Sequence, residues 1–104
     1  MATTIEEKAV ALGAKPWSPN SGPVRYYFND LEQYLGLEVQ RYGTGNINHA
    51  TLNGEKISNN YASKILISLA RAKVWLCEGT IYSKDLGTFS DVVIEGITNA
   101  LNTL

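Results

Sequence analysis

Turn signals that fit tight β-hairpins constrain the fold of this chain more than any other feature. Gly43-Thr44-Gly45-Asn46 separates two stretches in which apolar and polar residues alternate, and Glu78-Gly79 separates residues 73–77 from residues 80–83. Connections this short join antiparallel strands, because a parallel pair needs a crossover of a dozen or more residues. The sequence therefore predicts two hairpins and a mainly antiparallel sheet.

The apolar residues select a register for each hairpin. Pairing Tyr42 with Ile47 places Val39 opposite Ala50, which leaves the apolar pairs on one face and His49 on the other. The register of the second hairpin is predicted in the same way, from the residues on either side of its turn. Pairing Cys77 with Thr80 puts Trp75 opposite Tyr82 on one face, and the apolar side chains between them on the opposite face.

Helical periodicity completes the fold class. Helices are predicted over residues 4–12, about 58–72 and from Thr88 to the C-terminus, with Thr4 and Ser58 as N-caps. Residues 24–28 read as a further strand, which brings the sheet to about five strands. We expect an α+β domain in which the helices pack mainly on one side of the sheet.

The length of 104 residues and the 44% apolar content suit one domain, 1–104, with its own core. All three prolines fall within residues 14–23, which we interpret as a Pro-rich loop inside that domain. The start of the chain is acidic where a signal peptide would be basic, and no apolar run is long enough to span a membrane. With a single cysteine, these features predict a cytoplasmic protein that does not interact with membranes.

Charge is segregated along the chain. Residues 39–77 hold five bases and one acid, a net charge of +4, whereas the rest holds four bases and nine acids, a net charge of −5. Much of the excess falls on the predicted main helix, its two ends and the first hairpin. The predicted basic patch consists of Arg41, Lys56, Asn60, Lys64, Arg71 and Lys73. Such a patch suits an acidic partner surface.

Aromatic and polar side chains form a second group. They alternate outward on the predicted strands, so an open sheet face would present them together as a binding surface. The predicted binding residues are Arg25, Tyr27, Tyr42, His49, Trp75 and Tyr82. Our first hypothesis is a non-catalytic protein-binding module that contacts a protein partner, or a second copy of itself, through these side chains. If a helix covers that face instead, the rings belong to the core.

The second hypothesis is a nucleic-acid-binding accessory protein. Lys64 and Arg71 lie seven residues apart on the predicted main helix, and Lys56 and Lys73 lie at its two ends, so the helix could contact phosphates. Against this, the isoelectric point is acidic, about 5.7, and no helix-turn-helix, zinc-finger or RNP pattern occurs.

Catalytic groups are scarce, so a small enzyme or small-ligand binder is the third and weakest hypothesis. His49 and Cys77 are the only histidine and the only cysteine, too few to hold zinc without several carboxylates. We predict no catalytic residue, no metal and no cofactor. The glycine turn at 43–46 leads into a predicted strand, whereas phosphate-binding glycine loops lead into a helix.

Two segments carry a resemblance. Residues 42–47, with the sequence Tyr-Gly-Thr-Gly-Asn-Ile, and residues 52–59, with Leu-Asn-Gly-Glu-Lys-Ile-Ser-Asn, followed by Ala62, resemble a pattern in small proteins of phages and other mobile elements. Together with the strand at 25–29, the resemblance covers about half of the chain. It implies a protein that binds and modulates a host protein, such as one in antiviral defence, and it implies no site residues.

Overall fold

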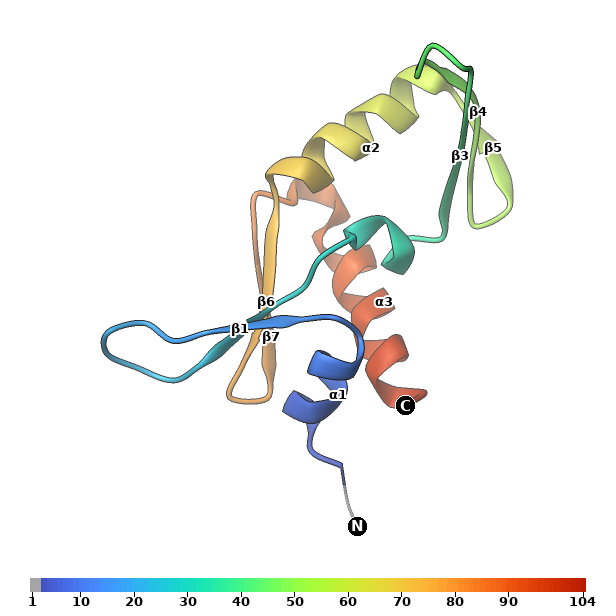
Figure 1. The fold of residues 1–104 in the computed structure, drawn as a ribbon. Helices are drawn as coiled ribbons and strands as arrows, with labels where there is room; N and C mark the ends of the chain where they lie inside the picture. The colour runs from blue at the N-terminus through green and yellow to red at the C-terminus, as the bar shows by residue number, and fades with distance from the viewer. Residues whose placement is uncertain (1–2) are drawn as a thin grey trace.

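The computed structural model describes residues 3–104, which form three helices, two 3-10 turns and seven strands (Figure 1). The helices are α1 (Ile5–Ala11), α2 (Asn59–Arg71) and α3 (Ser90–Asn102), and the 3-10 turns are η1 (Leu31–Tyr34) and η2 (Gly87–Phe89). The strands are β1 (Lys15–Trp17), β2 (Arg25–Tyr27), β3 (Leu37–Arg41), β4 (Ile47–Leu52), β5 (Glu55–Ile57), β6 (Lys73–Cys77) and β7 (Thr80–Lys84).

The strands form two antiparallel sheets, with the orders β1-β2-β6-β7 and β3-β4-β5. The α+β class and the antiparallel pairing are confirmed. The two predicted hairpins, however, lie in different sheets. β6 pairs with β2 on its second edge and β4 pairs with β5 on its second edge, so each hairpin extends into a sheet of its own.

The predicted N-caps form as expected. The backbone N–H of Glu7 donates to Thr4 Oγ1 at 3.1 Å, and the backbone N–H of Tyr61 donates to Ser58 Oγ at 3.1 Å. Each bond satisfies an amide that the first turn of a helix leaves without a partner. The caps fix where α1 and α2 begin.

The register of the β6–β7 hairpin is confirmed, with Trp75 opposite Tyr82. Its turn residues, Glu78 and Gly79, have φ angles of 49° and 79°, which a two-residue turn with the twist of the flanking strands requires.

In the β3–β4 hairpin, Val39 lies opposite Ala50 as predicted, but Tyr42 does not pair with Ile47. A bulge at this end of the hairpin places Arg41 opposite Ile47 instead, because β4 contributes one extra residue, Asn48, between the partners of Gln40 and Arg41. Tyr42 belongs to the turn.

The segment 14–23 is not only a loop. Its first part forms β1, which pairs with β2 so that Pro16 lies opposite Tyr26 and Trp17 lies opposite Arg25. Pro16 is tolerated because β1 is the edge of the sheet, where a missing N–H breaks no ladder. Residues 18–23 belong to the connection between β1 and β2.

One buried cluster connects the helices to the four-stranded sheet. Val74 and Leu76 of β6 are buried with Val93 and Ile97 of α3, and η1 joins them. Gly96 lets α3 approach η1 closely, since a Cβ at this position would overlap the backbone carbonyl of Tyr34.

The three-stranded sheet adds partly buried apolar residues to this cluster and packs against α2. The molecule is elongated, with extents of 43 × 31 × 25 Å. Its radius of gyration of 15.2 Å exceeds the roughly 13 Å usual for this length.

Candidate functional site: an aromatic–basic sheet face

The face of the four-stranded sheet opposite Val74 and Leu76 carries aromatic and basic side chains. Because side chains alternate along a strand, the register assigns ten positions to this face. We call it the aromatic–basic face, and it consists of Lys15, Trp17, Arg25, Tyr27, Lys73, Trp75, Cys77, Thr80, Tyr82 and Lys84.

Four rings run across the face in contact with one another. Trp75 and Tyr82 stack with their centroids 5.9 Å apart and their planes inclined by 21°. Tyr27 lies 5.6 Å from Trp75 at 38°, and Trp17 meets Tyr27 edge to face at 6.3 Å. Contacts of this kind fix the rings relative to one another, so the face is formed before any partner binds.

Arg25 contacts three of the four rings. Its guanidinium carbon lies 5.3 Å from the centroid of Trp75 and 5.9 Å from that of Trp17, within range of cation–π attraction to both indoles. Its Nη1 also donates to the hydroxyl oxygen of Tyr27 at 3.4 Å. The cation is thereby held at the surface in a defined position.

The electrostatics of the face differ from those of the rest of the chain. Its ten positions include four cations and no carboxylate, a net charge of +4, whereas the whole chain has −1, which leaves −5 elsewhere. Lys73 and Lys84 lie directly opposite each other on β6 and β7. Like charges in a cross-strand pair repel, so an anion placed between them would relieve the repulsion.

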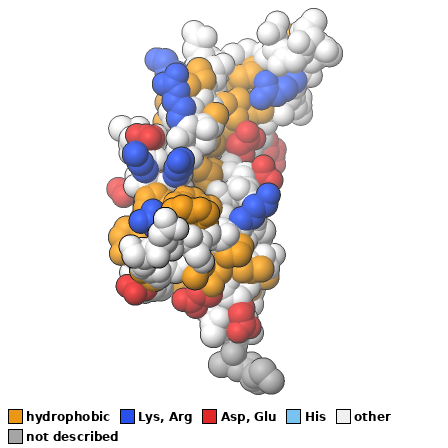
Figure 2. All heavy atoms as spheres, turned by 60° about the vertical axis from the view of Figure 1, so that its left-hand side comes forward, with side chains coloured by type: hydrophobic (Ala, Val, Ile, Leu, Met, Phe, Trp, Pro, Cys, Tyr) orange, Lys and Arg blue, Asp and Glu red, His pale blue; other side chains and the backbone are white. Residues whose placement is uncertain are grey.

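The aromatic–basic face is accessible to solvent. Trp17 and Tyr82 are 51% and 47% exposed, and Arg25, Tyr27 and Trp75 are partly buried. Figure 2 shows hydrophobic side chains at the surface with Lys and Arg side chains beside them. Large exposed aromatics next to cations are typical of protein interfaces.

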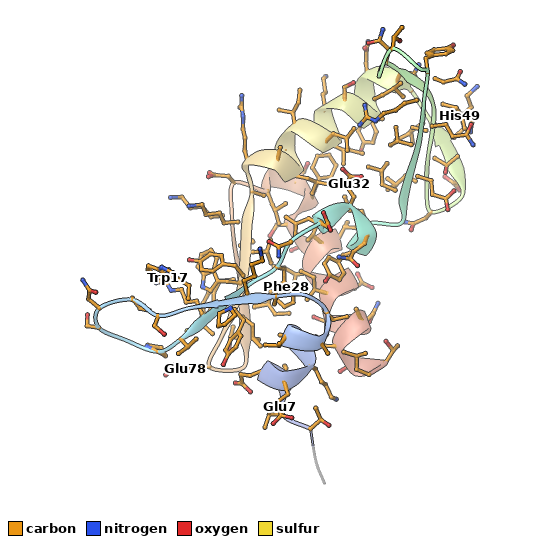
Figure 3. All side chains as sticks on the ribbon, in the orientation of Figure 1. Glu7, Trp17, Phe28, Glu32, His49 and Glu78 are labelled. Carbon is orange, nitrogen blue, oxygen red and sulfur yellow. The ribbon has the colours of Figure 1, made fainter. Side chains whose placement is uncertain are left out.

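The structure brings together four of the six predicted binding residues and separates the other two. Arg25, Tyr27, Trp75 and Tyr82 share the aromatic–basic face, whereas Tyr42 and His49 lie in the β3–β4 hairpin. Figure 3 shows His49 at one end of the molecule, far from Trp17. The six residues were grouped because both hairpins were predicted to lie in one sheet, whereas the structure places the hairpins in two sheets.

The predicted basic patch is also divided. Asn60, Lys64 and Arg71 are exposed on one side of α2, whereas Lys73 joins the aromatic–basic face. The two remaining members lie in the three-stranded sheet. Arg41 donates a hydrogen bond from Nη1 to the backbone oxygen of Gly45 at 3.0 Å and so stabilises the turn. Lys56 of β5 lies opposite Thr51 of β4.

Three of the charged and aromatic residues of the face were not predicted as site residues: Lys15, Trp17 and Lys84. Lys84 could have been found, because it lies two residues beyond Tyr82 on the same strand and therefore on the same side. Lys15 and Trp17 gave no usable signal, since β1 is short and lies in a proline-rich segment.

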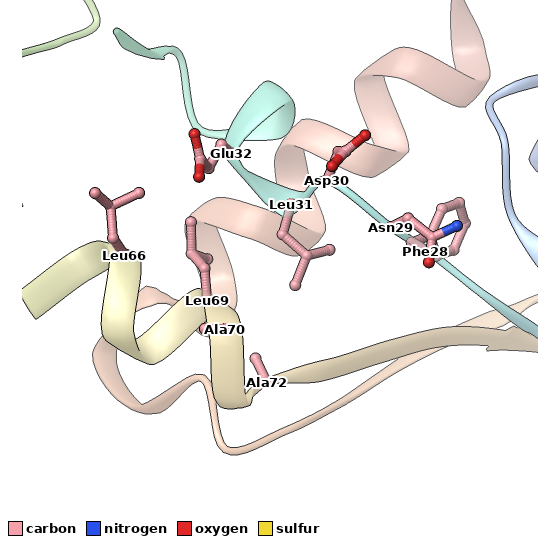
Figure 4. Close-up of a pocket in the computed structure, with 9 residues that line it drawn as sticks. All are labelled: Phe28, Asn29, Asp30, Leu31, Glu32, Leu66, Leu69, Ala70 and Ala72. Atoms are coloured by element: carbon pink, nitrogen blue, oxygen red, sulfur yellow. The ribbon is translucent and has the colours of Figure 1, made fainter. Parts of the chain in front are cut away.

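A hollow of about 310 Å³ lies between η1 and the C-terminal half of α2 (Figure 4). Asp30 and Glu32 stand beside apolar residues such as Leu31 and Leu66. Within residues 3–104 no group of three or more His, Cys, Asp or Glu side chains is arranged to hold a metal ion.

Tyr34 of η1 has a perturbed pKa. Burial raises the pKa of its hydroxyl, and the nearby Asp30 carboxylate raises it further. The hydroxyl oxygen is buried without a hydrogen-bond partner. This oxygen lies in the core, away from the aromatic–basic face.

The histidine and the cysteine are not brought together. His49 lies in the three-stranded sheet and Cys77 in the four-stranded one. No helix within residues 3–104 is long and apolar enough to cross a membrane. Comparisons with known protein families, with curated proteins and with solved structures find no match.

Proposed function

We propose that this chain is a non-catalytic binding module that docks an acidic protein surface on its aromatic–basic face. The observation that carries the proposal is the composition of that face: four cations and four contacting rings without one carboxylate, on a chain that is otherwise acidic. Ordered aromatics and arginine supply most of the binding energy in protein interfaces, and surrounding cations select an acidic partner.

The ring geometry favours a protein over a single-stranded nucleic acid. Bases bind by stacking on the open faces of aromatic rings. Tyr82 lies against one face of Trp75, and Arg25 lies over its ring at 5.3 Å, so the indole has little free face to offer a base. A protein partner needs only the exposed edges of the rings and the basic groups beside them.

The resemblance to small phage and mobile-element proteins extends the proposal to a host protein as the partner. A nucleic acid is the alternative partner, because the four cations of this face would also attract phosphates. For each partner class, the binding affinity should depend differently on the aromatic rings and on the salt concentration.

The experiment is a selection of peptides from a displayed random library on the whole chain. We expect the selected peptides to be rich in Asp and Glu combined with apolar residues. Tyr82→Ala should weaken their binding about tenfold or more, which corresponds to about 1.4 kcal/mol. Tyr42→Ala is the matched control, because Tyr42 is 57% exposed but lies off the face.

Charge reversal supplies the second pair of variants. Lys84→Glu should weaken the same peptides, whereas Lys64→Glu on α2 should leave them unchanged. Selected peptides without acidic residues, or equal losses at Tyr42 and Tyr82, would refute the proposal. A single-stranded oligonucleotide that binds the chain more tightly than every selected peptide would replace it with the nucleic-acid alternative.

A further inference from the structure

The two edges of the four-stranded sheet differ in what they offer a partner. β1 is three residues long and contains Pro16, which has no N–H to donate. β7 is five residues long, contains no proline and pairs only with β6 within residues 3–104. Sheet edges in proteins are usually blunted against pairing. β1 is blunted by its shortness and by Pro16, whereas β7 carries Lys84 at its end but no proline, so each of its residues keeps a backbone N–H.

The register identifies which backbone groups of β7 are free. Cys77 and Thr80 flank a two-residue turn, so they form a hydrogen-bonded pair. Along an antiparallel strand the groups then alternate, and the N–H and C=O of Ile81 and Ser83 point away from β6. These groups form a template for one more strand.

An apolar groove of about 290 Å³ runs beside this edge. It is lined by Thr80 and Ile81 of β7 together with residues of α1 and α3: Ile5, Ile94, Thr98 and Leu101. The side chain of Ile81 faces this groove, on the side opposite Tyr82. An exposed strand edge next to an apolar groove is the arrangement by which proteins bind extended peptides as an added strand.

The two faces of β7 specify which side chains such a strand would carry. Residues that point toward the groove would meet Ile81 and Ile94 and should be apolar. Residues that point the other way would lie next to Tyr82 and Lys84, with Lys73 one strand further in, and should be acidic. A strand with alternating apolar and acidic residues fits both faces.

A second copy of the chain fits less well. Two β7 strands paired with each other would place two aromatic–basic faces side by side, each with four cations and no acid. The like charges would oppose the contact. Charge complementarity therefore favours a partner of different composition.

We propose that β7 captures an extended segment of the acidic partner as an antiparallel fifth strand, with its apolar side chains in the groove at Ile81 and its acidic ones beside Lys84. The inference rests on the proposed acidic protein partner and states how that partner binds. The segment would continue the sheet and extend the aromatic–basic face.

The test uses the full chain, labelled for NMR, and a capped heptapeptide in which glutamate and valine alternate. In an antiparallel addition the valine residues exchange hydrogen bonds with Ile81 and Ser83, because their side chains point to the same face. We expect the amide protons of Ile81 and Ser83 to exchange with water about tenfold more slowly when the peptide is bound. A peptide with its glutamates and valines in separate blocks should not slow them.

Methylation of the peptide nitrogens separates strand addition from simple attraction. Methyl groups on the valine amides should abolish binding, whereas methyl groups on the glutamate amides should leave it intact. If both methylated peptides bind like the parent, strand addition is wrong, and a loss with Tyr82→Ala would still uphold the proposed face. Slow exchange of both amides in a free, dimeric chain would show that a second copy occupies the edge and would overturn the proposal.

Discussion

Replacing Gly96 with alanine has two effects of opposite sign on the stability of the fold. Gly96 lies inside α3, where alanine is favoured over glycine by about 1 kcal/mol of helix propensity. A Cβ at this position, however, would overlap the carbonyl oxygen of Tyr34 and lie 3.1 Å from its Cβ. The obstacle is mostly backbone and cannot rotate away, so overpacking should cost about 2–3 kcal/mol, the upper part of its usual range.

Because overpacking costs more than the gain in helix propensity, Gly96→Ala should lower the free energy of unfolding by about 1–2 kcal/mol and the melting temperature by about 5–10 °C. The assay is urea and thermal unfolding followed by circular dichroism. Asn99→Ala is the matched control, because Asn99 is exposed on the same helix and its replacement should gain propensity without a clash. A Gly96→Ala chain that is more stable than the natural one would refute the close packing of α3 on η1.

Three further substitutions test separate parts of the structure. Tyr34→Phe should raise the free energy of unfolding by about 1 kcal/mol, because it removes a buried hydroxyl without a partner. Since the pKa of Tyr34 is raised in the fold, the folded state loses stability as pH rises above about 10, and Tyr34→Phe should reduce that loss in alkaline unfolding. Ser58→Ala should cost about 1 kcal/mol in urea unfolding, because the N–H of Tyr61 loses its acceptor. Arg25→Gln should cost about 1 kcal/mol and change the tryptophan emission, because the guanidinium leaves the indole of Trp75; an unchanged emission would contradict the contact.

Local signals predicted the parts of the fold that local interactions determine. The turn Glu78-Gly79 and the caps Thr4 and Ser58 were identified correctly, because each depends on a few adjacent residues. The bulge after Gln40 was missed, since it depends on how the turn closes and the apolar pattern fits either register.

The candidate site was only partly predictable for a related reason. Trp75 and Tyr82 share a hairpin, so alternation alone placed them on one face. Their contact with Tyr27 depends on β2 pairing with β6 across almost fifty residues, which no local pattern encodes. Trp17 enters the site through β1, a strand too short for alternation to reveal.

The proposed function requires that the aromatic–basic face binds an acidic protein and does not stack bases. Both tryptophans of the chain, Trp17 and Trp75, lie on this face, so their fluorescence reports on it directly. The decisive measurement is a fluorescence titration with a selected acidic peptide and with a thymidine oligonucleotide, repeated between about 50 and 200 mM salt.

We expect the peptide to shift the emission and its Kd to change less than about tenfold over this range, because the rings contribute most of the binding energy. The oligonucleotide should leave the emission nearly unchanged. Strong quenching by the oligonucleotide, with a Kd that weakens about fiftyfold over the same range, as phosphate contacts by the four cations of the face require, would contradict the proposal and identify a single-stranded nucleic acid as the partner.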